Sequence, residues 1–474
     1  MTPTTFTIWD TETTGLSKAY DVPVEIGALI TDPTLQPIRD IHLSCRPPSS
    51  VLPHPGALLT TKRKFSELMS RAESSYETIS RFAQMVQAVT PTCFLTFNGV
   101  RFDDPLLQHT FYRHLHDPYV MMKGNCRLDM LSVVQLAHAL GQGDLVVPKS
   151  DDGKTSFKLD RIAPLNGFKE EGAHSALVDA RAVLHLARLR AGRAPEVWAR
   201  AVRLWSRKDA VGKLVDGAEV IVQFTWDWRK GGRPCFKALH PIGPGRCYAG
   251  DIVCVDLGVD PADYTSLDPS ELTSKITIGP KPRPICNVRL NGFPIVFNGD
   301  DPLVRNRVPV KAEVLAERAR CFRRDTGLRD RILDAVDLSR DNFEEPEHPE
   351  QQLYSGGFYS DHDMIKMERF HLVVPEQKLD VVRTFADRRL QYLGERLIFE
   401  EWPAALPLEI RARLDAERRG RHLSFMECPW TTVATALEAI DDLLPDTDDE
   451  GRAILLEYQA YLKDFLHSQN VLAA

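Results

Sequence analysis

The sequence predicts an α/β domain, a small β-barrel and a helical region, and the pattern of apolar residues supports each of the three. Residues 1–195 alternate strand-like runs with helical patterns, an order typical of a central mixed sheet between helices. Residues 196–345 hold short β-type runs whose spacing favours a small barrel. Residues 350–474 hold long stretches with helical periodicity. The Glu/Pro-rich segment NFEEPEHPEQQ is predicted to link the last two.

The first strand, in TFTIWDTETTGL, carries two carboxylates on one face. Alternate side chains of a strand point to the same side, which puts Asp10 and Glu12 together. Two carboxylates held this close repel each other unless a cation lies between them, and a hard ion such as Mg²⁺ or Mn²⁺ suits oxygen ligands. The alternative is a solvated pair on an edge strand. Gly15 is expected to supply the tight turn at the end of the strand.

A further carboxylate follows a predicted buried strand in FLTFNGVRFDDPLLQHTFYR. The run FLTF indicates the strand, Asn98-Gly99 indicates a turn, and Asp103 stands at the start of the helical pattern that follows. Asp103 is therefore a candidate metal ligand. The alternatives are that Asp103 caps the helix, or that Asp104 is the cap and leaves Asp103 free.

A third motif, GAHSALVDARAVLHLARLR, places Asp179 just over one turn into a predicted helix. Ser175 is the expected N-cap, and small residues begin the apolar face of the helix. Because small side chains let a helix lie close to a sheet, this helix is expected to bring Asp179 toward the first two carboxylates. His174 directly precedes the helix, and the alternative for it is a surface or structural histidine.

The overall composition favours a water-soluble protein of the cytoplasm. Of the 474 residues, 43% are hydrophobic and 26% are charged, which is ordinary for a globular protein. No apolar run reaches 18 residues, and the N-terminus lacks the pattern of a secretory signal. Nine cysteines without a C-x-x-C pair fit reduced thiols better than disulfides. Cys235, Cys247 and Cys254 lack zinc-ligand spacing and are expected in the barrel core.

In this order, D-x-E-T-T-G, N-x-x-x-F-D and H-x-A-x-x-D resemble the motifs of the DEDDh 3′→5′ exonucleases. Within that superfamily the chain resembles bacterial exonuclease I from Asp10 to about residue 365. The supporting stretches are NGVRFDDPLLQHTFYR, DPYV, RLDML, DDGKTSFKL, VRLNGFP and QQLYSGGFYSDHD. The resemblance implies a ribonuclease H-like exonuclease domain over residues 1–195, an SH3-like barrel over 196–345 and a helical C-terminal domain over 350–474.

The resemblance implies a monomeric exodeoxyribonuclease that releases 5′-mononucleotides from the 3′ end of single-stranded DNA, in repair or recombination. Hydrolysis is expected to use two Mg²⁺ ions, for which Mn²⁺ can substitute. Asp10 is expected to bridge both ions, with Glu12 and Asp179 completing one site. Asp103 is expected to help position the other ion, and His174 to take the proton from the attacking water. A net charge of −7 does not exclude DNA, because phosphates respond to the local field of a groove.

Several residues are candidate substrate contacts, each with an alternative. Lys158 stands where the family tends to have arginine, so it keeps the charge but loses bidentate contact with phosphate; the alternative is a solvated lysine. Leu16 and Phe102 are expected either to pack against terminal bases or to belong to the core. Arg127 either contacts DNA or pairs with Asp129. The full candidate set is Glu12, Leu16, Asn98, Phe102, Arg127 and Lys158.

The predicted barrel mixes aromatic and basic residues. Stacking combined with positive charge holds single strands without sequence preference, whereas core packing is the alternative for the tryptophans. The residues concerned are Trp226, Trp228, Arg229, Lys230 and Phe236.

The resemblance also implies a partner, the acidic C-terminal tail of single-strand DNA-binding protein. Arg323 falls at a matching position of the family's basic pocket, whereas Asn298 and Gly141 replace the glutamine and arginine usual there. Two other functions were weighed: an exoribonuclease that trims RNA 3′ ends, and a catalytically silent DNA-binding adaptor. The barrel and helical extension disfavour the first, and the presence of all four carboxylates and His174 disfavours the second.

Overall fold

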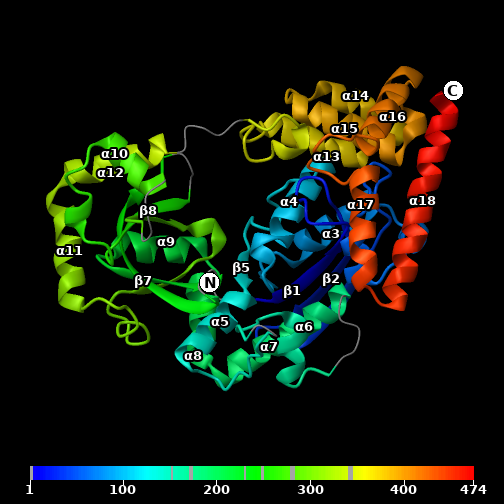
Figure 1. Cartoon of the computed structure of the whole chain (residues 1–474). Helices are drawn as coiled ribbons and strands as arrows, with labels where there is room; N and C mark the ends of the chain where they lie inside the picture. Colours follow the sequence, from blue (N-terminus) through cyan, green and yellow to red (C-terminus); the bar gives the residue numbers. More distant parts are fainter. Residues whose placement is uncertain are drawn as a thin grey trace.

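The computed structural model describes residues 4–150, 153–169, 175–228, 231–246, 250–277, 283–339 and 345–473. His174, Arg229, Lys230 and Cys247 lie outside the described residues, so the expectations for them stay predictions. Figure 1 shows the N-terminal α/β part in the middle, between a second sheet on one side and the C-terminal helices on the other. None of the helices in the described ranges has the length and apolar character needed to span a bilayer.

The first sheet is mixed, as the sequence predicts, and β1 lies at its centre. Its five strands follow the order β3-β2-β1-β4-β5. β1 pairs antiparallel with β2 and parallel with β4, and β4 pairs parallel with β5. The strands are β1 (Phe6–Thr13), β2 (Pro23–Thr31), β3 (Pro37–Ser44), β4 (Cys93–Thr96) and β5 (Cys126–Asp129).

Helices cover both faces of this sheet, and successive side chains of β1 point alternately into the cores on the two faces. Phe6 and Ile8 share one core with Val183 of α7, whereas Trp9 packs in a separate core with Phe82 of α3. The helices of this part are α1 (Pro55–Thr61), α2 (Phe65–Met69), α3 (Ser75–Val89), α4 (Asp103–Arg113), α5 (Met130–Leu140), α6 (Leu159–Leu165) and α7 (Ala176–Arg193), with a 3₁₀ turn η1 (Gly99–Arg101) before α4.

The second part is built on a five-stranded antiparallel sheet in the order β10-β6-β7-β8-β9. One of its faces joins the core of the first part, so that Val222 and Phe297 share a cluster with Ile8. Its other face packs on α11 and α12 through Phe322 and Ile332. That this sheet is SH3-like stays a prediction. The strands are β6 (Ile221–Asp227), β7 (Arg233–Pro244), β8 (Asp251–Asp256), β9 (Ile285–Arg289) and β10 (Ile295–Asn298).

Helices and short turns connect these strands and lead into them. They are α8 (Pro195–Arg200), a π-helical turn η2 (Ala201–Trp205), α9 (Lys208–Gly217), η4 (Pro261–Asp263), α10 (Pro269–Thr277), η5 (Leu290–Gly292), α11 (Ala312–Arg324) and α12 (Thr326–Leu338). The predicted boundary near residue 195 falls between α7 and α8 in the chain. Trp205, at the end of η2, is fully buried, and its Nε1 donates to the Val296 carbonyl of β10 at 2.8 Å.

The C-terminal part is helical and packs against the first part in two places. Leu390 and Leu393 of α15 belong to a cluster with Tyr112 of α4. Helices α17 and α18 form another cluster that includes Val24 at the start of β2. The elements are η6 (Pro349–Gln351), α13 (Asp361–Leu372), α14 (Pro375–Thr384), α15 (Arg388–Glu401), η7 (Pro403–Ala405), α16 (Leu408–His422), α17 (Val433–Leu443), η8 (Leu444–Asp446) and α18 (Asp449–Ala473).

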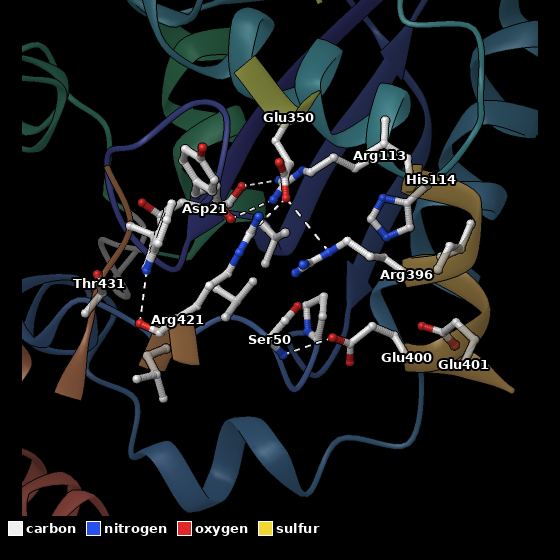
Figure 2. A pocket seen from close by; sticks show the side chains of 18 residues that line it. Asp21, Ser50, Arg113, His114, Glu350, Arg396, Glu400, Glu401, Arg421 and Thr431 are labelled. Carbon is white, nitrogen blue, oxygen red and sulfur yellow. Dashed lines mark hydrogen bonds and ion pairs between the residues drawn. The ribbon is translucent and has the colours of Figure 1, made fainter. Parts of the chain in front are cut away.

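A small cavity of about 80 Å³, lined by both apolar and charged residues, lies where the C-terminal helices meet the first part (Figure 2). Glu350, only 3% exposed, accepts a hydrogen bond from Arg421 Nη1 at 2.7 Å, and its Oε1 lies 3.8 Å from Arg396 Nε. Arg113 of α4 donates to the carbonyls of Tyr20 and Asp21 at 2.6 and 2.5 Å. Hydrogen bonds also cross this junction, because the N–H groups of Ser49 and Ser50 donate to the Glu400 carboxylate at 2.8 and 3.0 Å.

Candidate active site

The two carboxylates of β1 lie where the period of the strand predicts. In the register with β2, Asp10 lies opposite Gly27 and Glu12 lies opposite Glu25. Both carboxylates follow Phe6 and Ile8, which face the core shared with α7. Because β1 is paired on both sides, the edge-strand alternative is wrong. The strand instead presents both groups toward the helix that crosses it.

Helix α7 lies unusually close to the sheet at this point, because β2 has no side chain under its first turn. A Cβ atom on Gly27 would stand 2.2 Å from the backbone nitrogen of Leu177, so only glycine fits there. Ala176 and Ala180 are fully buried on the same side of the helix. Small residues on both elements therefore bring Asp179 next to β1, as the sequence predicts.

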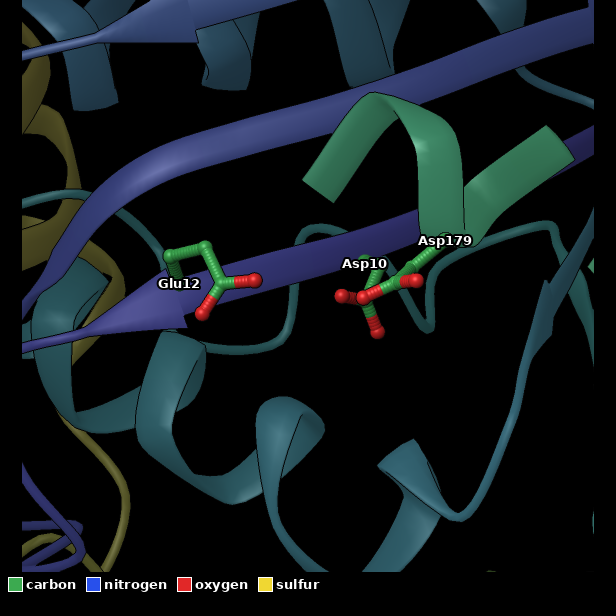
Figure 3. Close-up of side chains that lie close together, drawn as sticks. All are labelled: Asp10, Glu12 and Asp179. Atoms are coloured by element: carbon green, nitrogen blue, oxygen red, sulfur yellow. The ribbon is translucent and has the colours of Figure 1, made fainter. Parts of the chain in front are cut away.

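Three carboxylates, those of Asp10, Glu12 and Asp179, meet in one group (Figure 3). One oxygen from each lies within 4.8 Å of the others. Among the described residues this is the one group of histidine, cysteine or acidic side chains with the geometry to hold a metal ion. An all-oxygen, all-anionic donor set fits a hard divalent cation such as Mg²⁺.

The electrostatics of the group point the same way. Burial, followed by the charges of Asp103, Asp179 and Glu12, raises the pKa of Asp10 well above its ordinary value. Burial and the neighbouring acids, Asp179 first, raise the pKa of Glu12 from 4.5 to about 8. Such pKa values arise when carboxylates are packed together without enough positive charge to balance them. A bound cation would supply that charge.

Asp103, at the start of α4, is joined to β1 through Thr11. The Thr11 hydroxyl, which sits between the two acids of the strand, donates to Asp103 Oδ1 at 2.5 Å. Burial raises the pKa of Asp103 to about 6. Asp103 stands outside the group of three, but its charge raises the pKa of both Asp10 and Glu12, so it lies close to them.

Neither aspartate of the Asp103-Asp104 pair is the N-cap residue of α4. Phe102 occupies that position and makes no side-chain capping bond. Asp104 is buried and forms an ion pair with Arg127. The interpretation of Asp104 as the cap is therefore wrong, and so is the alternative in which Arg127 pairs with Asp129, because Arg127 pairs with Asp104 instead. Arg127 is 5% exposed, and its guanidinium also lies over the ring of Phe293 at 5.6 Å.

The other candidate substrate residues differ in their exposure to solvent. Leu16 is 82% exposed, so the core alternative is wrong for it, whereas Phe102 is half-buried. Asn98 is exposed in a left-handed conformation, with φ of 67°, and its N–H donates to Asp129 Oδ1 at 2.8 Å. Gly15 needs room rather than a special φ, because a Cβ there would stand 2.5 Å from Asp21 Oδ2.

Lys158 is exposed and directly follows Phe157, which is buried against the second sheet. The Phe157 ring lies 4.8 Å from Trp226 and 6.2 Å from Trp228. Trp226 is half-buried in this junction, as the core alternative expects, whereas Trp228 is 48% exposed. Phe236 is half-buried, with its ring 5.2 Å from that of Phe224.

The three positions compared with the family's partner pocket have different local roles. Arg323 is exposed and pairs with Glu219 Oε2 at 3.1 Å. Asn298 ends β10 and is exposed. Gly141 ends α5 in a left-handed conformation, with φ of 68°. A pocket shared by the three positions stays a prediction.

Sequence reasoning missed Glu25, which lies opposite Glu12. Its Oε1 accepts hydrogen bonds from the Ser175 hydroxyl and the Ala176 N–H, both at 3.0 Å. Ser175 occupies the N-cap position of α7, as predicted, but its side chain makes no capping bond. The sequence feature that could have pointed to Glu25 is its position as the single acidic residue of the otherwise apolar strand VEIGALI.

Comparison with known proteins covers nearly the whole chain. A family model described as Exonuclease matches residues 7–187, and one described as Exonuclease I C-terminal domain matches residues 347–465. Exodeoxyribonuclease I of Escherichia coli K12 is 27% identical over 431 residues, which are 88% of this chain and 89% of that protein. A moderately thermophilic exonuclease I from Methylocaldum szegediense is 25% identical in a structural superposition with a TM-score of 0.84, covering 97% of this chain and 99% of that one.

Several solved structures of exonuclease I share this fold. A complex of the Escherichia coli protein with a dA16 oligonucleotide superposes with a TM-score of 0.84 at 24% identity, covering 97% of this chain and 99% of that one. A zinc-bound complex with single-stranded DNA and a structure of SSB/exonuclease I with the inhibitor CFAM give TM-scores of 0.83 and 0.82, at 23% and 24% identity. Both cover 98% of this chain, and 100% and 99% of those chains.

Proposed function

The chain belongs to the bacterial exonuclease I family, and from this we propose that it is an exodeoxyribonuclease that degrades single-stranded DNA from the 3′ end. The relative from Escherichia coli is matched over 89% of its own length, so the activity concerns the whole chain and not only the N-terminal part. The second sheet and the C-terminal helices belong to the same overall fold. An exoribonuclease built on the first part alone would need neither.

One observation carries the chemistry, namely the group of three carboxylates on β1 and α7. Asp10, Glu12 and Asp179 would hold a divalent cation, which we propose to be Mg²⁺, with Mn²⁺ as a substitute and a second ion beside the first. When bound, two such ions stabilise the entering and leaving oxygens of an in-line displacement at phosphorus. The raised pKa values of Asp10 and Glu12 support this, because a cation and protons compete for the same oxygens.

The remaining acids and the histidine have separate tasks in this proposal. The Thr11 hydroxyl holds Asp103, which is proposed to help position the second ion and whose charge adds to the negative potential that attracts cations. His174, in the residues just before α7, is proposed to accept the proton of the attacking water. With a pKa that is ordinarily near neutrality, an imidazole suits this step.

We propose that four of the candidate substrate residues bind the 3′ end of the DNA strand. Leu16, exposed at the end of β1, would pack on the terminal bases together with Phe102. Asn98 would bind through its exposed amide and Lys158 through its charge. Arg127 would act through Asp104 and its buried ion pair, without touching the DNA. Trp228, exposed beside Phe157, offers a stacking surface farther along the strand.

Further proposals concern partners and location. The chain is proposed to act as a monomer in repair or recombination and to bind the acidic tail of single-strand DNA-binding protein near Arg323. The eight cysteines of the described residues are free thiols, which supports a cytoplasmic protein.

The experiment compares a single-stranded DNA oligomer, labelled at its 5′ end, with an RNA of the same sequence. We expect progressive shortening of the DNA from its 3′ end in Mg²⁺, release of 5′-mononucleotides, and no reaction in chelator. Asp10→Asn should abolish the reaction, whereas Asp380→Asn, at an exposed position of α14, should leave it unchanged. Faster loss of RNA would favour the exoribonuclease, and DNA binding without cleavage would favour the silent adaptor.

A further inference from the structure

Glu25 of β2 is a buried carboxylate that faces α7 instead of solvent. Its side chain is 3% exposed, and one oxygen accepts both the Ser175 hydroxyl and the Ala176 N–H at 3.0 Å. The first N–H groups of a helix have no partner within the helix, and they attract negative charge. Glu25 therefore takes the role that the N-cap side chain usually has, from a strand that lies 150 residues earlier in the chain.

Two basic groups hold the carboxylate in place. His42 Nε2, on β3, lies 3.0 Å from Glu25 Oε1, and Arg63 Nη2 lies 3.8 Å from Oε2. Both partners are partly exposed, with side chains 48% and 37% accessible. Glu25 is thus fixed by its own strand and by groups beside β2, so its position does not depend on α7.

The capped turn leads directly to a candidate cation ligand. The carbonyl of Ser175 accepts the N–H of Asp179 at 3.0 Å, so the residue that Glu25 holds is also the first hydrogen-bond partner of Asp179 within the helix. Under this turn Gly27 leaves no space between helix and strand. A small movement of the first turn of α7 would therefore carry Asp179 away from Asp10.

We propose that Glu25 is a positioning residue, which fixes the first turn of α7 on β2 and thereby keeps the Asp179 carboxylate within reach of a cation shared with Asp10 and Glu12. Glu25 itself touches neither substrate nor the reacting atoms. The inference rests on the proposed function only for its effect on catalysis. The effect on the mobility of the helix follows from the hydrogen bonds alone. Cation affinity also depends on the charge of Glu25, which contributes to the raised pKa of Asp10 and Glu12, and Ser175→Ala keeps that charge while it removes a hydrogen bond.

The test uses the full chain and three variants. Glu25→Ala removes the oxygen that accepts both hydrogen bonds, and Ser175→Ala removes one of the two donors. Glu67→Ala is the matched control, because Glu67 also accepts from Arg63, at 2.9 Å, but does not contact α7. Each protein is titrated with Mn²⁺ in a calorimeter, the exchange of backbone amides 175–182 is followed by mass spectrometry, and kcat and KM are measured on a thymidine oligomer.

We expect Glu25→Ala to weaken Mn²⁺ binding tenfold or more, to speed amide exchange in residues 175–182, and to lower kcat with little change in KM. Ser175→Ala should weaken Mn²⁺ binding by a smaller factor of about 2–5, and Glu67→Ala should match the unmodified protein. Glu25→Gln keeps an oxygen acceptor, so amide exchange in residues 175–182 should be nearly as slow in this variant as in the unmodified protein.

Unchanged Mn²⁺ affinity and exchange in Glu25→Ala would overturn the proposal, even if the melting temperature fell, because Glu25 would then serve stability alone. If Glu25→Ala does not fold, unchanged affinity and exchange in Ser175→Ala would overturn it. A protein that binds Mn²⁺ but leaves single-stranded DNA intact would refute the proposed function instead, and the cation and exchange measurements would still decide the role of Glu25.

Discussion

The raised pKa of Glu12 predicts that the metal-free protein loses stability as pH rises. Protonated Glu12 is tolerated in the fold, but its ionised form faces burial and the charge of Asp179. The pKa is about 8 in the fold against an ordinary 4.5, a difference of 8 − 4.5 = 3.5 pH units. At about 1.4 kcal/mol per pH unit, ionising Glu12 in the fold costs about 5 kcal/mol relative to the unfolded chain.

The sign follows from proton binding. Between pH 4.5 and 8 the folded chain holds a proton on Glu12 that the unfolded chain has lost, so the free energy of unfolding falls as pH rises through that window. Glu12→Gln removes this titration. In chelator, the variant should therefore match the unmodified protein near pH 4.5 and exceed its stability by about 3 kcal/mol at pH 7.

Urea unfolding in chelator at half-unit steps from pH 4.5 to 9 measures both curves. Adding Mg²⁺ should narrow the gap, because a cation favours the ionised carboxylate of the unmodified protein and has less affinity for the amide. Glu67→Gln, at an exposed position, serves as the control and should run parallel to the unmodified protein. Parallel curves for Glu12→Gln and the unmodified protein would refute the reasoning.

Three further predictions concern packing and buried charge. Gly27→Ala should cost ~1–3 kcal/mol of stability and weaken Mn²⁺ binding, because α7 must move away from β2. Urea unfolding measures the loss of stability and calorimetry measures the Mn²⁺ affinity. An unchanged Mn²⁺ affinity would contradict the prediction. Arg127→Ala should cost ~3–5 kcal/mol in urea unfolding by leaving Asp104 buried without its partner, and adding Asp104→Ala should restore part of that loss. Burial lowers the pKa of His371 to about 4, so stability should be lost as pH falls below 6.5, and thermal melts of His371→Asn should show a flatter pH profile than those of the unmodified protein.

The regular spacing of residues within β1 and α7 was enough to predict the centre of the site. Contacts between residues far apart in the chain were not predicted. The period of two along β1 placed Asp10 beside Glu12, and the small residues of α7 indicated its close approach to the sheet. The ion pair of Arg127 with Asp104 joins β5 to α4 and depends on how these elements pack, which no local pattern encodes.

The same limit applies to the residues that support the site. The capping of α7 by Glu25 spans 150 residues, so the local rule that assigns caps to Ser175 could not find it. Gly15 was expected for its φ but is needed for space, because its neighbour Asp21 follows in a loop whose path the sequence does not specify.

The helix that carries Asp103 also depends on a segment far along the chain. His109 Nδ1 and the Tyr112 hydroxyl, both on α4, bond at 3.0 and 2.9 Å to the carbonyls of Glu350 and Pro349. A fragment ending near residue 195 would retain every acid of the site yet leave these two side chains without acceptors. Cutting the chain there should yield a loosened, poorly active remnant, so the C-terminal helices support chemistry that takes place in the N-terminal part.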